Sequence, residues 1–162
     1  MVAVFVSHIR PILDYASSVW NVGYIGDVKK LERVQRRWTR EVEGMVGVDY
    51  RARLLRIRLF SIYGRLHRSD LIKIWKAFNM DIDIGLLGLL ERHSHVSTRG
   101  HGLKLSIPLC RGEVRRRCWG VRSVSVWNSL PTDVVQSVSL ETFKKRLDQF
   151  MGERFYETVD GR

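Results

Sequence analysis

The stretch DVKKLERVQRRWTREV, residues 27–42, decides the fold class of this chain. Apolar residues recur along it at spacings of three and four, at Val28, Leu31, Val34, Trp38 and Val42. Such spacing places them on one stripe of an α-helix. The stretch therefore predicts an amphipathic helix whose apolar stripe packs on the rest of the domain.

The ends of this helix are marked by ordinary helix signals. Asp27, which follows Gly26, can accept hydrogen bonds from the first backbone N–H groups, so we expect it to be the N-cap. Gly44 and Gly47 lie just beyond the last apolar position and suit the exit from a helix.

The remaining surface of the predicted helix is strongly basic. Residues 28–58 hold ten Lys or Arg against four Asp or Glu. Neutralisation of nucleic-acid phosphates is the natural use of such density. The alternative is a solvated helix face on which Glu32, Glu41 and Glu43 form ion pairs with the neighbouring arginines. The candidate phosphate-binding residues of this helix are Lys29, Lys30, Arg33, Arg36, Arg37 and Arg40.

The sequence on either side predicts further helices. Residues 2–20 favour an opening helix or a strand followed by a helix, and a short helix follows an Asp49 cap. A final amphipathic helix follows a Ser139 cap. The short helix after Asp49 is expected at residues 50–56, and a long helix is expected at residues 61–79. The apolar stripe of the final helix consists of Leu140, Phe143, Leu147 and Phe150.

Residues 100–126 have a different texture. Residues 103–107 alternate between apolar and polar types, which predicts a short strand that Pro108 ends. Residues 121–127 alternate as well, and their periodicity fits either a strand or a helix. We therefore expect a mainly α fold with a minor strand or loop region around 100–126. It forms one helical region over residues 1–150, with a frayed tail at 151–162.

Composition narrows the class of protein. The chain has 162 residues, a formal net charge of +11 and two cysteines, Cys110 and Cys118. So few cysteines exclude a disulfide-stapled secreted scaffold, and no apolar run approaches the roughly 20 residues of a membrane helix. An intracellular protein with an anionic partner, nucleic acid before a membrane, is the expectation.

Motifs for catalysis or cofactor binding are scarce. The sequence has no glycine-rich phosphate loop, nucleophile elbow or paired Cys-x-x-Cys, so we expect neither an enzyme nor a cofactor. His93, His95 and His101, with Cys110 nearby, match no zinc spacing and are better interpreted as solvated loop histidines. The pair Asp81 and Asp83 is better interpreted as a helix exit than as half of a metal site.

A second basic group occurs in residues 99–122, which hold seven Lys or Arg against one acidic residue. Arg115, Arg116 and Arg117 are its candidate phosphate contacts. Five tryptophans could offer stacking surfaces for bases. For Trp38 and Trp127, which fall on apolar stripes, core packing is the favoured interpretation.

Five motifs follow one another along most of the chain: RPILDYASSVW at 10–20, KLERVQRRWT at 30–39, RLHRSDLI at 65–72, TRGH at 98–101 and VWNSLP at 126–131. Residues Phe143, Lys144, Leu147 and Asp148 close the pattern. In this order the motifs resemble the region after the palm of reverse transcriptases from non-LTR (LINE-type, jockey-like) retrotransposons.

This resemblance implies a thumb-like region that grips a template–primer duplex with helices and basic residues. The polymerase Tyr-x-Asp-Asp motif is absent from this sequence, so no catalytic role carries over. The resemblance places Arg33, Arg36, Arg37 and Arg40 in the family's basic helix and implies a palm region as a further partner. The alternatives are a helical interaction protein with an acidic partner and a relic reading frame.

Overall fold

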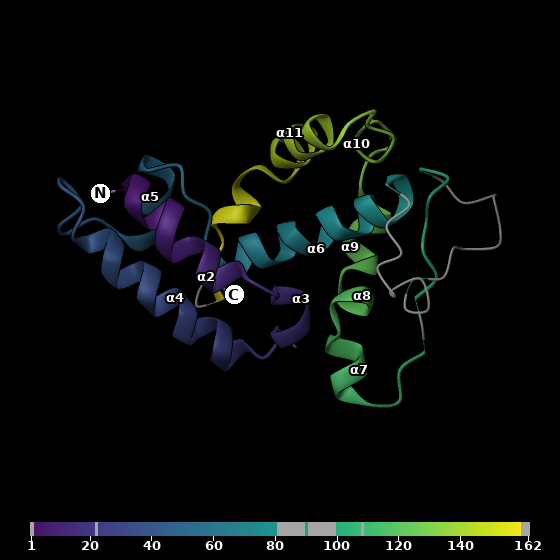
Figure 1. Ribbon diagram of the computed structural model, residues 1–162, viewed down its shortest axis with the longest axis horizontal. Helices are drawn as coiled ribbons and strands as arrows, with labels where there is room; N and C mark the ends of the chain where they lie inside the picture. Colours follow the sequence, from purple (N-terminus) through teal and green to yellow (C-terminus); the bar gives the residue numbers. More distant parts are fainter. Residues whose placement is uncertain (1, 22, 81–89, 91–99, 108, 160–162) are drawn as a thin grey trace. The chain divides into compact units, whose positions relative to one another are not determined.

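The computed structural model describes residues 2–21, 23–80, 90, 100–107 and 109–159 (Figure 1). The chain divides into two compact units, whereas the sequence predicted one helical region over 1–150. The first unit comprises Met1–Arg68 with Glu153–Arg162, and the second comprises Ser69–Gly152. Both are built from helices, so the mainly α fold class is confirmed.

The first unit opens with four short helical segments, so its first residues form a helix and no strand. Pro11 lies at the start of α2, where its fixed φ suits a first helical turn. Ala16, with φ at 49°, interrupts the helix before α3. The segments are α1 (Val2–Val4), the π-helical turn η1 (Phe5–Ile9), α2 (Arg10–Asp14) and α3 (Ser17–Trp20).

The core of the first unit joins these segments to α4 (Ile25–Arg40) and α5 (Tyr50–Arg56), which lie together in Figure 1. Phe5 is fully buried, and its ring stacks on Trp38 with the centroids 4.2 Å apart. Leu54 and Leu59 are buried in the same cluster. The N-terminal segments therefore cover α4, as its sequence pattern required.

The start of α4 differs from the prediction. Tyr24 is the N-cap, and Asp27 lies inside the first turn, where its carboxylate accepts a hydrogen bond from Lys30 at 3.1 Å. An acidic residue in the first turn stabilises a helix through the macrodipole without capping it. The α5 prediction is confirmed, because the Asp49 carboxylate accepts from the N–H of Arg51 at 2.9 Å.

The chain end packs on α6 (Ile62–Asn79) instead of fraying over residues 151–159. A 3₁₀ helix, η3 (Gly152–Tyr156), carries the buried ring of Phe155. The Ser61 N–H donates to the Phe155 carbonyl at 3.0 Å, and the Ser61 hydroxyl donates to the Glu157 carbonyl at 2.6 Å. Gly64 permits this approach, because a Cβ there would lie 2.2 Å from the Phe155 carbonyl oxygen.

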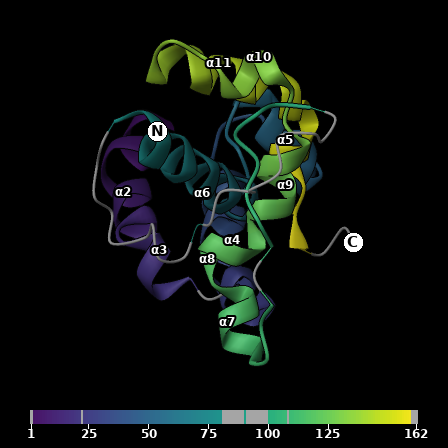
Figure 2. The same cartoon turned by 90° about the vertical axis from the view of Figure 1, so that its right-hand side faces the viewer.

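The second unit is organised by aromatic side chains. Trp75 and Phe78 of α6 stack on Phe143 and Trp127, with centroids 5.4 and 5.7 Å apart. Figure 2 shows α7, α8 and α9 following one another, and α10 leading into α11. The helices are α7 (Glu113–Arg117), α8 (Trp119–Arg122), α9 (Val124–Ser129), α10 (Thr132–Val135) and α11 (Leu140–Met151).

The predicted strand at 103–107 is wrong for its described residues. Only Leu105 is in a bridge conformation, and its backbone is bonded instead by the side chain of Asn128. The Leu105 N–H donates to Asn128 Oδ1 at 2.9 Å, and Asn128 Nδ2 donates to the Leu105 carbonyl at 2.8 Å. The amide side chain of Asn128 thus holds this segment at Leu105, and residues 121–127 are mostly helical.

The final helix follows its predicted cap. The Ser139 hydroxyl accepts from the Thr142 N–H at 3.2 Å, and Phe143 and Leu147 are fully buried. Phe150 is 42% exposed and Met151 is buried in its place. The α11 stripe is thus correct except at its last turn. Asp81, Asp83, His93 and His95, considered above as metal ligands, lie outside the described residues.

Candidate nucleic-acid interface

The buried face of α4 is polar, which its apolar stripe did not predict. Val28, Glu32, Gln35 and Thr39 are buried along it at spacings of four, three and four, whereas Val34 is 46% exposed. The prediction is thus correct in part: Val28, Leu31 and Trp38 of the apolar stripe pack in the core clusters, while the other fully buried side chains of α4 are polar and lie beside the stripe. The reason lies in the hydrogen bonds that this face makes.

Glu32 binds the start of α6. Its Oε1 accepts from the Ile62 N–H and its Oε2 from the Tyr63 N–H, each at 3.2 Å. The Tyr50 hydroxyl also donates to Oε1. These two backbone N–H groups are among the four that a helix N-terminus leaves unsatisfied. Glu32, which was predicted to form a helix ion pair, is only 3% exposed. The positive charge of Arg36 acts on its carboxylate, and the three donors above bind it.

Gln35 extends the same network. Its Nε2 donates to the Phe60 carbonyl at 2.9 Å and to the Tyr50 hydroxyl at 3.2 Å. Burial raises the pKa of Glu32 above its ordinary 4.5, although the bonds from Tyr50 and the two amides oppose that rise. Burial and the neighbouring Glu32 charge raise the pKa of Tyr50. Directional bonds of this kind fix the rotation of α4 about its own axis.

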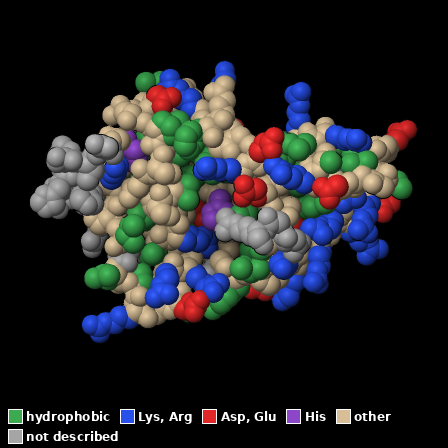
Figure 3. Space-filling model, turned by 180° about the vertical axis from the view of Figure 1, so that it is seen from behind, with side chains coloured by type: hydrophobic (Ala, Val, Ile, Leu, Met, Phe, Trp, Pro, Cys, Tyr) green, Lys and Arg blue, Asp and Glu red, His purple; other side chains and the backbone are tan. Residues whose placement is uncertain are grey.

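The basic face of α4 lies opposite this network. At 3.6 residues per turn its six cations occupy about 120° of arc, centred on the side away from Gln35 and Thr39. Figure 3 shows Lys and Arg side chains gathered over this part of the surface. Lys30, Arg33, Arg37 and Arg40 are exposed, and Lys29 and Arg36 are partly buried. Glu41 and Glu43 are exposed too, and neither forms an ion pair within the described residues.

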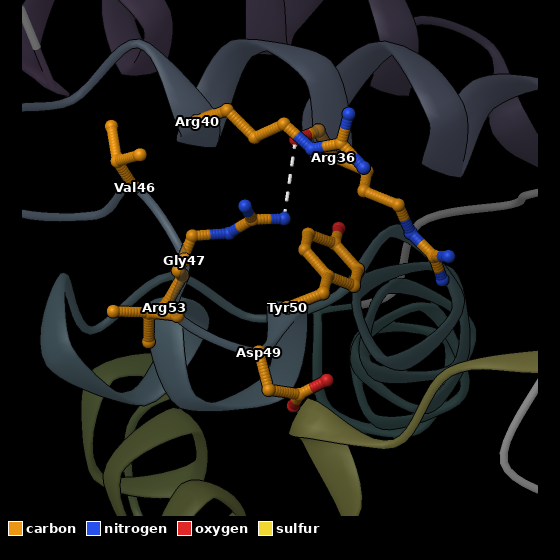
Figure 4. A pocket seen from close by; sticks show the side chains of 8 residues that line it. Arg36, Arg40, Val46, Gly47, Asp49, Tyr50 and Arg53 are labelled. Atoms are coloured by element: carbon orange, nitrogen blue, oxygen red, sulfur yellow. Dashed lines mark hydrogen bonds between the residues drawn. The ribbon is translucent and has the colours of Figure 1, made fainter.

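A pocket of about 540 Å³ lies at the C-terminal end of this basic face. Its walls are α4, the turn at 46–49 and α5, and three arginines line it: Arg36, Arg40 and Arg53 (Figure 4). Arg53 is 4% exposed. Its Nη2 donates to the Arg36 carbonyl at 3.4 Å.

Tyr50 stands between two of these cations. The guanidinium of Arg36 lies 4.8 Å from its ring centroid, and that of Arg53 lies 5.5 Å away. Burial, and next the positive charge of Arg40, lower the pKa of Arg53. Arg40 and Arg53 thus bring two positive charges close together in the pocket, and Asp49 is the one carboxylate in its lining.

The second candidate group, Arg115–Arg117, forms most of α7 in the second unit. Arg115 and Arg116 are exposed, and Arg117 pairs with Glu113 at 2.6 Å. This group therefore offers fewer uncompensated cations than α4 does. Sequence reasoning missed Arg53 and Tyr50, although both fall within the basic stretch 28–58 that drew attention to α4.

The other candidates have structural roles in this fold. His101, expected to be solvated, is 2% exposed, and its Nε2 lies 3.1 Å from the Trp127 carbonyl oxygen. Trp127 is fully buried, so its core role is confirmed, whereas Trp38 is half-buried under Phe5. In the described part of the chain, neither Cys110 nor Cys118 takes part in a disulfide. The described residues contain no His, Cys, Asp or Glu group that could hold a metal ion.

Within the described part of the chain, no helix combines the length and apolar character needed to cross a membrane. Comparisons of the chain with family models, with curated proteins and with solved structures found no match.

Proposed function

We propose that this chain is a non-catalytic, thumb-like region of a reverse transcriptase of the non-LTR retrotransposon type, which holds the backbone of a template–primer duplex with α4. The observation that carries this proposal is the basic face of α4. Its exposed Lys and Arg lie opposite a buried face whose hydrogen bonds fix the helix rotation. A row of cations held in one direction suits a regular row of phosphates.

The test is binding to an RNA–DNA hybrid, duplex DNA and single-stranded RNA, measured by fluorescence anisotropy over a range of salt concentrations. Each phosphate neutralised on duplex DNA contributes about −0.9 to the slope of log K against log salt. We expect a steep slope, with both duplexes preferred over the single strand. Binding that does not respond to salt would refute backbone contact.

A matched pair of variants locates the contact. The triple variant Arg33→Ala, Arg37→Ala and Arg40→Ala removes three exposed cations from α4 and spares Arg36, which contacts Tyr50. The control removes the same charge elsewhere, at Lys144, Lys145 and Arg154. The α4 variant should flatten the duplex slope by up to about 2.7. Equal losses in both variants would mean that net charge, and not α4, causes the binding.

Protein binding is a second candidate, and one observation favours it. The apolar side chains of Ile12, Tyr15 and Val19 on α2, α3 and the turn between them are more than three-quarters exposed. Exposed apolar groups that gather on one surface often mark a protein interface, and a palm region is the partner that the resemblance implies. Ile12→Ser with Val19→Ser should leave duplex binding unchanged and abolish binding to a separately produced palm.

A further inference from the structure

We infer that the pocket between α4, the turn at 46–49 and α5 binds a single phosphate group, held by Arg40 against the fixed charge of Arg53. The inference deepens the proposed function, because it names one ordered phosphate position at the end of the α4 face. The phosphate-binding inference rests on the proposed function only in taking the phosphate to belong to a nucleic acid.

The first argument is the charge that the pocket leaves uncompensated. The guanidinium groups of Arg40 and Arg53 line it, and Asp49 supplies the one carboxylate of its lining. That carboxylate already accepts the Arg51 N–H at 2.9 Å, as the cap of α5. Neither Arg40 nor Arg53 forms an ion pair with any residue that the structure describes. An anion would therefore relieve repulsion that the folded protein otherwise bears.

The second argument is that Arg53 is held in place before any ligand arrives. It is buried, its Nη2 is bonded to the Arg36 carbonyl, and its guanidinium lies over the Tyr50 ring. Its Nε has no hydrogen-bond partner in the described chain. An arginine fixed in this way loses little side-chain entropy when an anion binds, and guanidinium groups match the geometry of phosphate oxygens.

The third argument is the shape of the pocket. A volume of about 540 Å³ exceeds the space of one phosphate group and leaves room for the adjoining sugar. Tyr50 is not available for base stacking, because the guanidinium groups of Arg36 and Arg53 lie over its ring. The pocket therefore suits the phosphate and sugar of a strand better than its base.

The experiment titrates the full chain with inorganic phosphate at constant ionic strength, followed by two-dimensional amide NMR. Arg40→Gln removes an exposed pocket cation, and Arg33→Gln is its control on the same helix outside the pocket. We expect phosphate to shift the signals of residues 46–53, and Arg40→Gln to weaken binding about tenfold or more while Arg33→Gln changes it little. Arg53→Lys keeps the charge but loses the fork, so it should weaken binding while leaving the fold intact.

Equal weakening by Arg40→Gln and Arg33→Gln, or no phosphate binding, overturns the pocket. The salt dependence of duplex binding is measured independently of phosphate binding. The proposed function can therefore stand when the phosphate pocket is refuted, and the reverse also holds. The source is read from oligonucleotides with a 5′-phosphate or a 5′-hydroxyl. If the protein prefers the 5′-phosphorylated oligonucleotide and Arg40→Gln removes this preference, the pocket binds the phosphate of a strand terminus. If both oligonucleotides bind equally and free phosphate competes with them, the pocket binds an internal phosphate.

Discussion

The two units of this protein are stabilised in different ways. In the first unit, the longest buried helix face is polar, and Glu32, Gln35 and Tyr50 join α4 to α5 and to the start of α6 by hydrogen bonds. In the second unit, Trp75, Trp127 and their aromatic neighbours fill the core. Hydrogen bonds depend on direction, whereas apolar burial depends on volume. In the first unit these directional bonds act on α4, the helix that bears the candidate interface.

The largest expected effect is on the aromatic core. Trp127 is fully buried, contacts Phe78, His101 and Phe143, and donates its Nε1–H to the Leu103 carbonyl at 2.8 Å. Trp127→Ala should lower the free energy of unfolding by about 3 to 5 kcal/mol, because it leaves a cavity and an unpaired carbonyl. Urea denaturation measures the loss.

Trp20→Ala is the matched control, since Trp20 is 38% exposed, and it should cost under about 1 kcal/mol. Hydrogen exchange resolved by peptide would show which unit opens. Comparable losses for the two variants would contradict an aromatic core centred on Trp127.

The polar face of α4 should be nearly as sensitive to substitution. Glu32→Ala leaves the Tyr50 hydroxyl and the amides of Ile62 and Tyr63 without their acceptor. We expect a loss of about 2 to 4 kcal/mol in the free energy of unfolding, because buried donors without partners are costly. Glu41→Ala, on the same chain segment but exposed, should stay within about 0.5 kcal/mol.

Tyr50→Phe tests whether this is a network. It removes the hydroxyl that Glu32→Ala would leave without an acceptor. The double variant Glu32→Ala with Tyr50→Phe should therefore lose less stability than the two single variants added together. Strict additivity would mean that Glu32 and Tyr50 act independently.

The amino-acid pattern predicted most helices but not which face of α4 is buried. Periodicity identified α5, α6 and α11, because their apolar stripes and the caps Asp49 and Ser139 act locally. It placed Val28, Leu31 and Trp38 in the core correctly. It missed the burial of Glu32 and Gln35, since their partners include backbone groups of residues 60–63, far along the chain. The basic face of α4 was predicted from the density of Lys and Arg in residues 28–58, whereas the place of Arg53 in a pocket is seen only in the folded chain. The missing strand has the same cause, because only the fold brings Asn128 beside Leu105.

A smaller effect tests the packing of the chain end on the first unit. Gly64→Ala would place a Cβ 2.2 Å from the Phe155 carbonyl oxygen, so η3 must shift, at a cost of about 1 to 3 kcal/mol. Gly26→Ala is the matched control in α4, with no atom within 4 Å of its Cβ. It should stabilise the protein by up to about 1 kcal/mol, because alanine favours a helix. Thermal unfolding of both variants measures these changes in stability. If Gly64→Ala left the stability unchanged, η3 would not pack on α6.

The smallest effect is a pH dependence that both units share. Burial raises the pKa of Glu32 above 4.5 and that of Asp70 above 3.8. The positive charge of Arg36 opposes the rise at Glu32, and that of Arg122, 2.7 Å from Asp70, opposes it there. Between the ordinary and the raised pKa the native state binds more protons than the unfolded state. The stabilising contribution is therefore complete below the ordinary value and is lost as pH rises through the raised one, by at most about 1.4 kcal/mol per pH unit for each group.

Urea denaturation between pH 4 and 7 would resolve these two contributions. Glu32→Gln should flatten the fall in stability with rising pH, because the amide cannot ionise, and it should do so with little loss at the acidic end. Asp70→Asn should flatten it too, but with a loss at every pH, because Arg122 and Lys73 then lack their buried carboxylate. A Glu32→Gln variant whose stability follows the wild-type slope would show that Glu32 is not the titrating group. The difference between the two variants in the free energy of unfolding then measures how much the stability of each unit depends on its buried carboxylate.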